Sequence, residues 1–191
     1  MEVDEGELKM VLKNQFLLAM PGLTGTYFGD SVTYICEHNE DGAMGIMVNR
    51  PTHVSLVELL SQLGINTGST PIEVTIMEGG PVHRDHGFIL HTDDKRFESS
   101  LILENGLMLT SARDVLEAIA DGRGPTDYLV AMGYAGWQGG QLEAELKENA
   151  WLTCPANADV LFHTPYADRV ATAAASLGID FKLMSGHAGH A

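Results

Sequence analysis

Short apolar runs, each closed by turn residues, recur along the chain and predict β-strands. The run 14–20 ends at a Pro-Gly pair, which is typical of a buried strand. The runs 31–38 and 43–48 flank an Asn-Glu-Asp-Gly segment, whose Asp-Gly step is a strong turn signal, so they predict a β-hairpin. The remaining predicted strands are 72–77, 87–91, 101–110 with a second hairpin turn at Asn105-Gly106, 128–132, 151–154 and 160–163.

Helical periodicity appears in four other segments. Ser55 and Glu58 have the spacing of a capping box, and they begin a leucine-rich helix that stops before Gly64. Two further helices are predicted over 111–122 and 141–148. The last follows Pro165, and its predicted inner face consists of Tyr166, Val170, Ala173, Ala174 and Leu177.

The order of these elements predicts the fold class. Strands come in hairpin-like groups with helices between them, without the strict strand-helix alternation of a doubly wound sheet, so α+β is favoured over α/β. Many short strands in one small domain predict a mainly antiparallel, barrel-like β-core with about four flanking helices. We expect a single domain over residues 8–183, with flexible ends at 1–7 and 185–191.

Charge narrows the classes of partner. The chain has 11 basic and 26 acidic residues and a formal charge of −15, so it repels phosphodiester backbones and direct nucleic-acid binding is disfavoured. No apolar stretch approaches the length of a membrane span, and the acidic N-terminus does not resemble an export signal. With Cys36 and Cys154 as its only cysteines, the chain is expected in the reduced cytoplasm, away from membranes.

Four phrases of the sequence together resemble the bacterial AlgH/YqgE family. They are Ala19–Pro21 followed by Tyr34–His38, Gly42–Gly45 running into Val48–Pro51, Gly79–Val82, and Gly133–Trp137 followed by Gly140–Glu143. The resemblance implies an α+β fold with a barrel-like core and a cytoplasmic bacterial protein, but it supplies no mechanism. It also implies an effect on transcription, which the negative charge leads us to interpret as indirect.

The glycine-rich segment 133–140 is predicted to be a loop between a strand and a helix. Its backbone N–H groups are candidates to hold an anion beside the start of the helix. The segment lacks the second glycine of a dinucleotide fingerprint, where Ala135 stands, and no Gly-Lys-Ser/Thr follows for a P-loop. The alternative, which we favour, is that these glycines allow a tight turn and close packing under Trp137.

Cys36 and His38 are two residues apart on a predicted strand, so their side chains are expected on the same face. A thiolate-imidazole pair is one interpretation, although strand neighbours at this spacing start roughly 6 to 7 Å apart, which is too far for a direct dyad. A buried cysteine beside a hydrogen-bonded histidine is the interpretation we favour. Arg50, before Pro51, offers either a fork for an anion or an ion pair with Glu37 or Glu78, and both remain open.

These features lead to one hypothesis for a binding site. Polar and glycine-rich segments at strand ends are expected to converge on a single cleft that accepts an anionic group. Its candidate residues are Glu37, His38, Asn49, Arg50, Gly79, Gly80, Gly133, Gly136, Trp137 and Gln141, with Cys36 as a possible reactive thiol. His83, His86 and His91 match no zinc spacing with a second ligand pair, so the sequence predicts neither a metal site nor a cofactor.

We therefore predict a binding module for a small molecule or a protein partner, with an indirect regulatory role. The first alternative is an enzyme that uses Cys36 or His38. The second is a transcriptional regulator that contacts DNA, which the charge of −15 disfavours.

Overall fold

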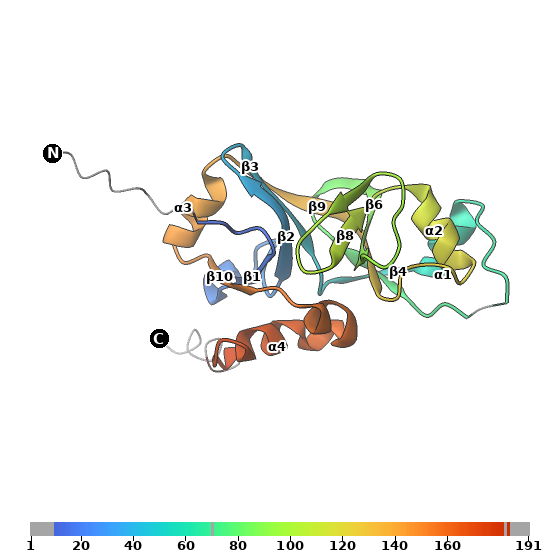
Figure 1. Ribbon diagram of the computed structural model, residues 1–191. Coiled ribbons are helices and arrows are strands. Elements are labelled where there is room, and N and C mark those ends of the chain that lie inside the picture. The colour runs from blue at the N-terminus through green and yellow to red at the C-terminus, as the bar shows by residue number, and fades with distance from the viewer. Residues whose placement is uncertain (1–9, 70, 182, 184–191) are drawn as a thin grey trace.

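A curled, mainly antiparallel sheet forms the centre of the protein, in a computed structural model that describes residues 10–69, 71–181 and 183 (Figure 1). Within these residues the sheet has ten strands, joined in the order β10-β1-β2-β3-β9-β6-β8-β7, and a β4–β5 pair attaches to β9 through β5. The strands are β1 (Gln15–Ala19), β2 (Val32–Asn39), β3 (Gly42–Met47), β4 (Pro51–Ser55), β5 (Thr75–Glu78), β6 (Val82–Thr92), β7 (Ser100–Ile102), β8 (Leu107–Thr110), β9 (Tyr128–Gln138) and β10 (Trp151–Pro155).

The curled sheet and its flanking helices confirm the expected α+β class and the barrel-like core, which closes only halfway (Figure 1). Both predicted hairpins form, because β2 pairs antiparallel with β3 and β7 pairs antiparallel with β8. The expected ends 1–7 and 185–191 lie outside the described residues.

Strand β9 runs through the middle of the sheet and corrects the expected loop over 133–140. The strand continues to Gln138, because its second half pairs with β3 from Gly45↔Ala135 to Gly42↔Gln138. Its backbone is therefore committed to sheet pairing, which leaves no extended glycine loop to hold an anion. Only Gly139 and Gly140 separate the strand from α3 (Gln141–Lys147).

The Gly79-Gly80 turn crosses β9 at a point where the two backbones nearly touch. A Cβ atom built on Gly80 would overlap the Tyr134 carbonyl, and one built on Gly133 would overlap the Gly80 carbonyl. Gly79 also joins the neighbouring strands, because its N–H donates to Met132 and its carbonyl accepts from Met47, both at 2.8 Å. The glycines of this turn are thus required for packing.

Four α-helices flank the sheet in the described residues, as predicted. Helix α1 (Leu56–Gln62) begins with the expected capping box, in which Ser55 and Glu58 exchange hydrogen bonds of 3.2 and 2.8 Å. Helix α2 (Arg113–Ala120) packs beside α1 at one end of the sheet, where Leu60 and Ile119 share a core cluster. Helix α3 covers the opposite end, and α4 (Arg169–Ala175) lies along the lower side in Figure 1.

Two expectations near the C-terminal helix were wrong. Residues 160–163, expected as a strand, belong to a π-helical turn (Asp159–His163), because the Asn157 side chain accepts the Val160 N–H at 2.9 Å and starts a turn. In the expected inner face of the last helix, Ala173 and Ala174 are buried, but Tyr166 and Leu177 are 42% and 40% exposed. The helix runs only from Arg169 to Ala175, so Tyr166 lies in a separate 3₁₀ turn (Tyr166–Asp168) before it and Leu177 lies after its end.

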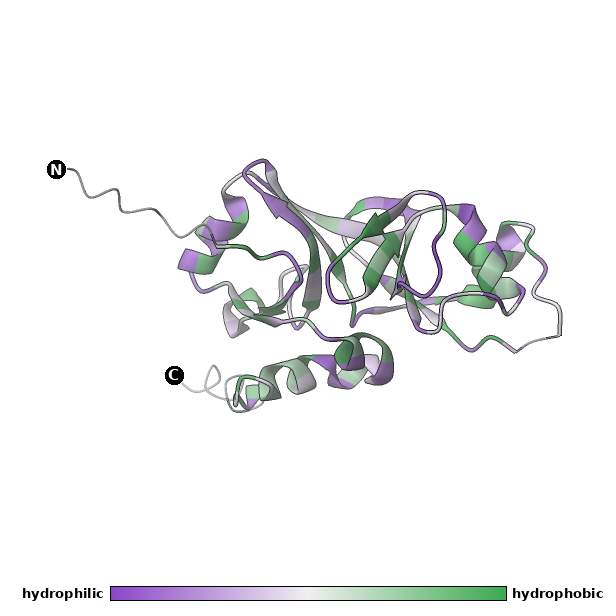
Figure 2. Ribbon diagram, viewed as in Figure 1, coloured by the Kyte–Doolittle hydropathy of each residue, from purple (hydrophilic) through white to green (hydrophobic). Residues whose placement is uncertain are grey.

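Hydrophobic residues concentrate on the central strands, whereas the tip of the β2–β3 hairpin is hydrophilic (Figure 2). The largest core cluster lies inside the curl and includes Tyr34, Cys36 and Leu90. A smaller cluster on the outer side contains Trp137, Leu142 and Trp151 beneath α3. None of the helices in the described part of the chain has the length and apolar character needed to cross a bilayer.

Candidate functional site

An open groove of about 570 Å³ lies between the tip of the β2–β3 hairpin and the second half of β9. The strand register builds it, because Glu37 pairs with Met44 and Met44 pairs with Gly136, so these three residues form one row across the sheet. Val82 pairs with Tyr134 in the next part of the groove. Asn39 and Asp41, in the hairpin turn, complete the polar rim.

The groove combines an acidic rim with an apolar floor. Glu37 and Asp41 have no ion-pair partner within the described residues, and the groove's lining contains no lysine, arginine or histidine among them. Met44, Val82 and the Tyr134 ring supply the apolar surface. The expected anionic guest does not suit this chemistry, because two carboxylates would repel it.

The candidate residues of the sequence analysis do not share one cleft. Glu37, Gly136 and Trp137 line the groove, but the Trp137 indole is buried and donates to Glu145 at 2.7 Å. Gln141 accepts the Gln138 N–H at 3.0 Å, which closes the turn into α3. Gly79, Gly80 and Gly133 form the backbone crossing described above.

Asn49 and Arg50 lie at a different place and bind the backbone. Asn49 donates to the Asp30 carbonyl at 2.8 Å and accepts the Val32 N–H at 2.9 Å. The Arg50 guanidinium donates to the carbonyls of Tyr27 and Gly29, at 2.5 and 3.1 Å, and lies over the Tyr27 ring. Neither residue reaches the groove. Arg50 thus anchors the 27–29 turn, whereas the sequence left open an anion fork and an ion pair with Glu37 or Glu78.

A β-bulge separates Cys36 from His38. The register of β2 and β3 shifts between Ile35 and Glu37, so Cys36 is the extra residue and the expected common face is lost. Cys36 is fully buried in the inner core, and burial raises the pKa of its thiol far above the ordinary value. His38 lies against α3 instead, where its Nε2 is 2.5 Å from Glu143 and its Nδ1 accepts the Leu12 N–H. The pair is therefore not a catalytic dyad.

Five further residues line the groove that were not among the predicted site residues: Asn39, Asp41, Met44, Val82 and Tyr134. The signal for Tyr134 was present, because alternate residues of a strand point to the same side. Tyr134 and Gly136 thus face the groove, while Ala135 and Trp137 face the outer cluster. The alternation of side chains between the two faces applies only to a strand, and residues 133–140 were predicted to form a loop.

Residues 16–182 match a protein family described as AlgH-like. A UPF0301 protein of Thioalkalivibrio sulfidiphilus is 52% identical over 178 residues, which are 93% of this chain and 96% of that protein. A UPF0301 protein of Xanthomonas oryzae is 50% identical over 181 residues, which are 94% of this chain and 96% of that protein.

Solved structures are also similar to this chain. The solution structure of the AlgH protein from Pseudomonas aeruginosa has 45% sequence identity and a TM-score of 0.76, with 100% of both chains covered. The crystal structure of a protein from Corynebacterium diphtheriae has a TM-score of 0.70 over 91% of each chain. At 20% identity, that second likeness is one of fold alone.

Proposed function

Since the chain belongs to the AlgH-like family, whose relatives carry names that state no activity, we propose its function from the groove itself. The protein is a binding module for a small molecule that carries a cationic nitrogen on an apolar stem. The observation that carries this proposal is the acidic rim above an apolar floor, in which Glu37 and Asp41 have no ion-pair partner among the described residues.

The chemistry of the groove supports such a ligand at three levels. An ammonium or guanidinium group is attracted to Glu37 and Asp41. The Asn39 amide oxygen already accepts the Asp41 N–H at 2.8 Å and keeps a second lone pair for the ligand. The apolar stem covers Met44 and Val82, and the Tyr134 ring is suited to a cation over its face. The formal charge of −15 also draws cationic ligands toward the protein.

The environments of Cys36 and His38, the two candidate reactive side chains, support binding without catalysis. Cys36 is buried with a raised pKa, and His38 is engaged by Glu143 and by the Leu12 N–H. We propose that any effect on transcription is indirect and follows from ligand binding, because the net charge opposes contact with DNA. Two free, buried cysteines support a cytoplasmic location.

Calorimetric titration of the full chain tests this proposal with three probes built on the same apolar stem: putrescine, 1,4-butanediol and adipate. We expect saturable binding of putrescine and none of the diol or the diacid. Glu37→Gln and Asp41→Asn should each weaken the binding of putrescine by about 1.4- to fivefold, because an exposed charge pair contributes about 0.2 to 1 kcal/mol.

The matched control is Glu98→Gln, which removes one exposed charge away from the groove and should leave the affinity unchanged. Equal weakening by Glu98→Gln would show unspecific attraction to an acidic protein. Tighter binding of adipate than of putrescine, or no binding of putrescine, would contradict the proposal.

A further inference from the structure

Strand β6 contains a large bulge at residues 83–86, where its pairing with β9 is interrupted. Val82 pairs with Tyr134 and Gly87 pairs with Met132, so residues 83–86 of β6 face only Gly133 on β9. The bulge begins at His83, whose φ of 46° lies in the left-handed region that non-glycine residues seldom adopt. Such bulges redirect side chains away from the sheet.

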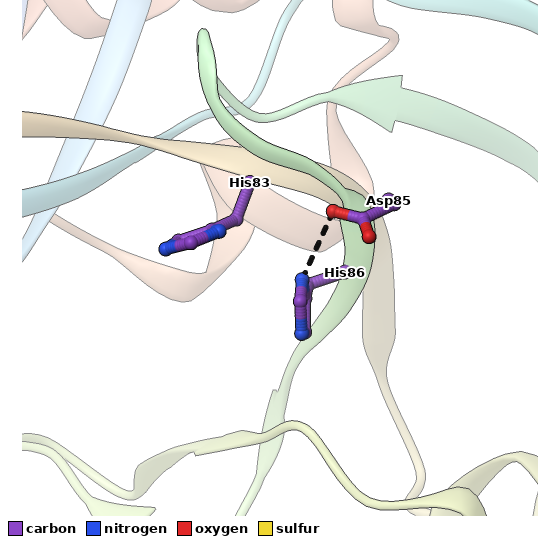
Figure 3. Close-up of side chains that lie close together, drawn as sticks. All are labelled: His83, Asp85 and His86. Atoms are coloured by element: carbon purple, nitrogen blue, oxygen red, sulfur yellow. Dashed lines mark hydrogen bonds and ion pairs between the residues drawn. The ribbon is translucent and has the colours of Figure 1, made fainter.

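The redirected side chains bring two imidazoles and a carboxylate together (Figure 3). One possible ligand atom from each of His83, Asp85 and His86 lies within 4.8 Å of the other two. His86 Nδ1 is 3.1 Å from the Asp85 carboxylate, and the two imidazole ring centroids are 5.2 Å apart. All three residues are exposed, so they can change rotamer and can be reached from solvent.

Neighbouring side chains hold this arrangement and leave its donor atoms available. The His83 ring lies beside Tyr134, with ring centroids 5.9 Å apart, and no hydrogen bond to either of its nitrogens is found within the described residues. Arg84 points elsewhere, because its guanidinium lies 3.6 Å from Glu78 and over the Tyr27 ring. The one cationic side chain inside the bulge is therefore kept away from the three donors.

We propose that His83, Asp85 and His86 bind a divalent transition-metal ion of the zinc class, with water in the open position. Imidazole nitrogen with one carboxylate oxygen suits Zn²⁺, Ni²⁺ and Cu²⁺, whereas Mg²⁺ and Ca²⁺ prefer oxygen alone. Bonds of about 2.0 to 2.1 Å in a tetrahedral site separate neighbouring donors by about 3.3 Å. The Asp85–His86 pair already has that spacing, and His83 reaches it by rotation of an exposed side chain.

Calorimetric titration of the chelator-treated full chain with Zn²⁺ tests the site, with Mg²⁺ as the comparison ion. We expect saturation at one Zn²⁺ per chain and no saturation with Mg²⁺. His83→Ala and His86→Ala should each weaken Zn²⁺ binding by roughly tenfold or more, because each removes one of three ligands.

Two control variants make the result specific. His53→Ala removes an exposed histidine from β4 and should leave Zn²⁺ binding unchanged. The double variant His187→Ala, His190→Ala removes the two histidines near the C-terminus and should also bind Zn²⁺ normally. Thermal unfolding without metal checks that each variant folds. Zn²⁺ binding that survives His83→Ala and His86→Ala, or that vanishes with the double variant, would overturn the proposal.

Discussion

His91 is the last member of a hydrogen-bond chain that the neutral imidazole completes. Its Nδ1 lies 2.7 Å from the Thr92 carbonyl, which only accepts, so this nitrogen carries the proton. Its Nε2 then accepts from the Thr110 hydroxyl at 2.7 Å, and Thr110 accepts from Ser100 at 2.8 Å. Ser100 in turn accepts the Phe97 N–H at 3.1 Å. A second proton, on Nε2 of His91, would prevent this nitrogen from accepting the hydrogen bond of the Thr110 hydroxyl.

We predict that His91 makes the protein less stable in mild acid. Burial lowers the pKa of His91 below its ordinary value, so the unfolded chain binds the proton more readily than the folded one. The stability from His91 is present above about pH 6.5 and is lost as the pH falls through the folded-state pKa. His91→Gln should therefore lose less free energy of unfolding than the parent chain between about pH 7.5 and about pH 5.

Urea denaturation of the two proteins at a series of pH values measures this difference. His163, whose pKa is raised by hydrogen bonds to Asp159 and Asp127, contributes in the opposite direction but is present in both proteins and cancels. Parallel pH profiles for His91→Gln and the parent chain would refute the role of His91.

Among the structural elements, β9 and the turn before β6 require glycine where their backbones cross. Gly133 has a φ of 76°, and a Cβ there would overlap the Gly80 carbonyl, whereas a Cβ on Gly136 would meet its nearest neighbours at 3.5 and 3.9 Å. Both glycines belong to the same strand. They therefore form a matched pair in which only one position forbids a side chain.

We predict that Gly133→Ala reduces the free energy of unfolding by about 2 to 5 kcal/mol, because left-handed strain and overpacking add. Gly136→Ala should change it by less than about 0.5 kcal/mol. Chemical denaturation of both variants measures the contrast. Similar losses of unfolding free energy in the two variants would contradict the view that the backbone crossing with Gly80 requires glycine at position 133.

Features of the fold that are determined by residues close together in the sequence could be predicted from local patterns. The capping box of Ser55 and Glu58 and the hairpin turn at Asn105-Gly106 are determined within a few positions, and both formed as expected. Strand β4 was missed because it starts at Pro51 and is largely exposed, so it lacks the apolar alternation of a half-buried strand.

The composition of the site could not be predicted in the same way. The bulge at Cys36 changes which side chains of β2 share a face, and no local pattern marks it. Likewise, Arg50 donates to the carbonyls of Tyr27 and Gly29, which lie far from it in the sequence and come close only in the folded chain. The sequence identified Glu37, Gly136 and Trp137 as site candidates, while the register of three strands determined what joins them.

At the scale of the whole molecule, Arg169 ties the C-terminal helix to the sheet. Its guanidinium donates to the Val48 carbonyl at the end of β3 and to the Thr164 carbonyl at 3.1 Å. Arg169 is buried, and no carboxylate of the described residues pairs with it. Its contribution is therefore made through hydrogen bonds to the backbone.

We predict that Arg169→Met lowers the free energy of unfolding by about 1 to 3 kcal/mol, because it keeps the apolar stem but leaves buried carbonyls unpaired. The control, Arg113→Met, removes an exposed ion pair with Glu117 and should cost less than about 1 kcal/mol. Thermal and chemical denaturation measure both effects. If Arg169→Met lowered the free energy of unfolding no more than Arg113→Met does, the stabilising role of the Arg169 hydrogen bonds would be contradicted.

Amide NMR shifts that map the position of bound putrescine show whether the acidic groove is its binding site. We expect saturable shifts confined to the hairpin tip and the second half of β9, including the amides of Glu37, Asp41, Met44 and Gly136. These shifts should weaken in Glu37→Gln and persist in Glu98→Gln. Shifts that gather elsewhere on the molecule would contradict binding in the groove. Shifts that weaken equally in Glu37→Gln and Glu98→Gln would contradict it as well, because they would depend only on the total charge of the protein.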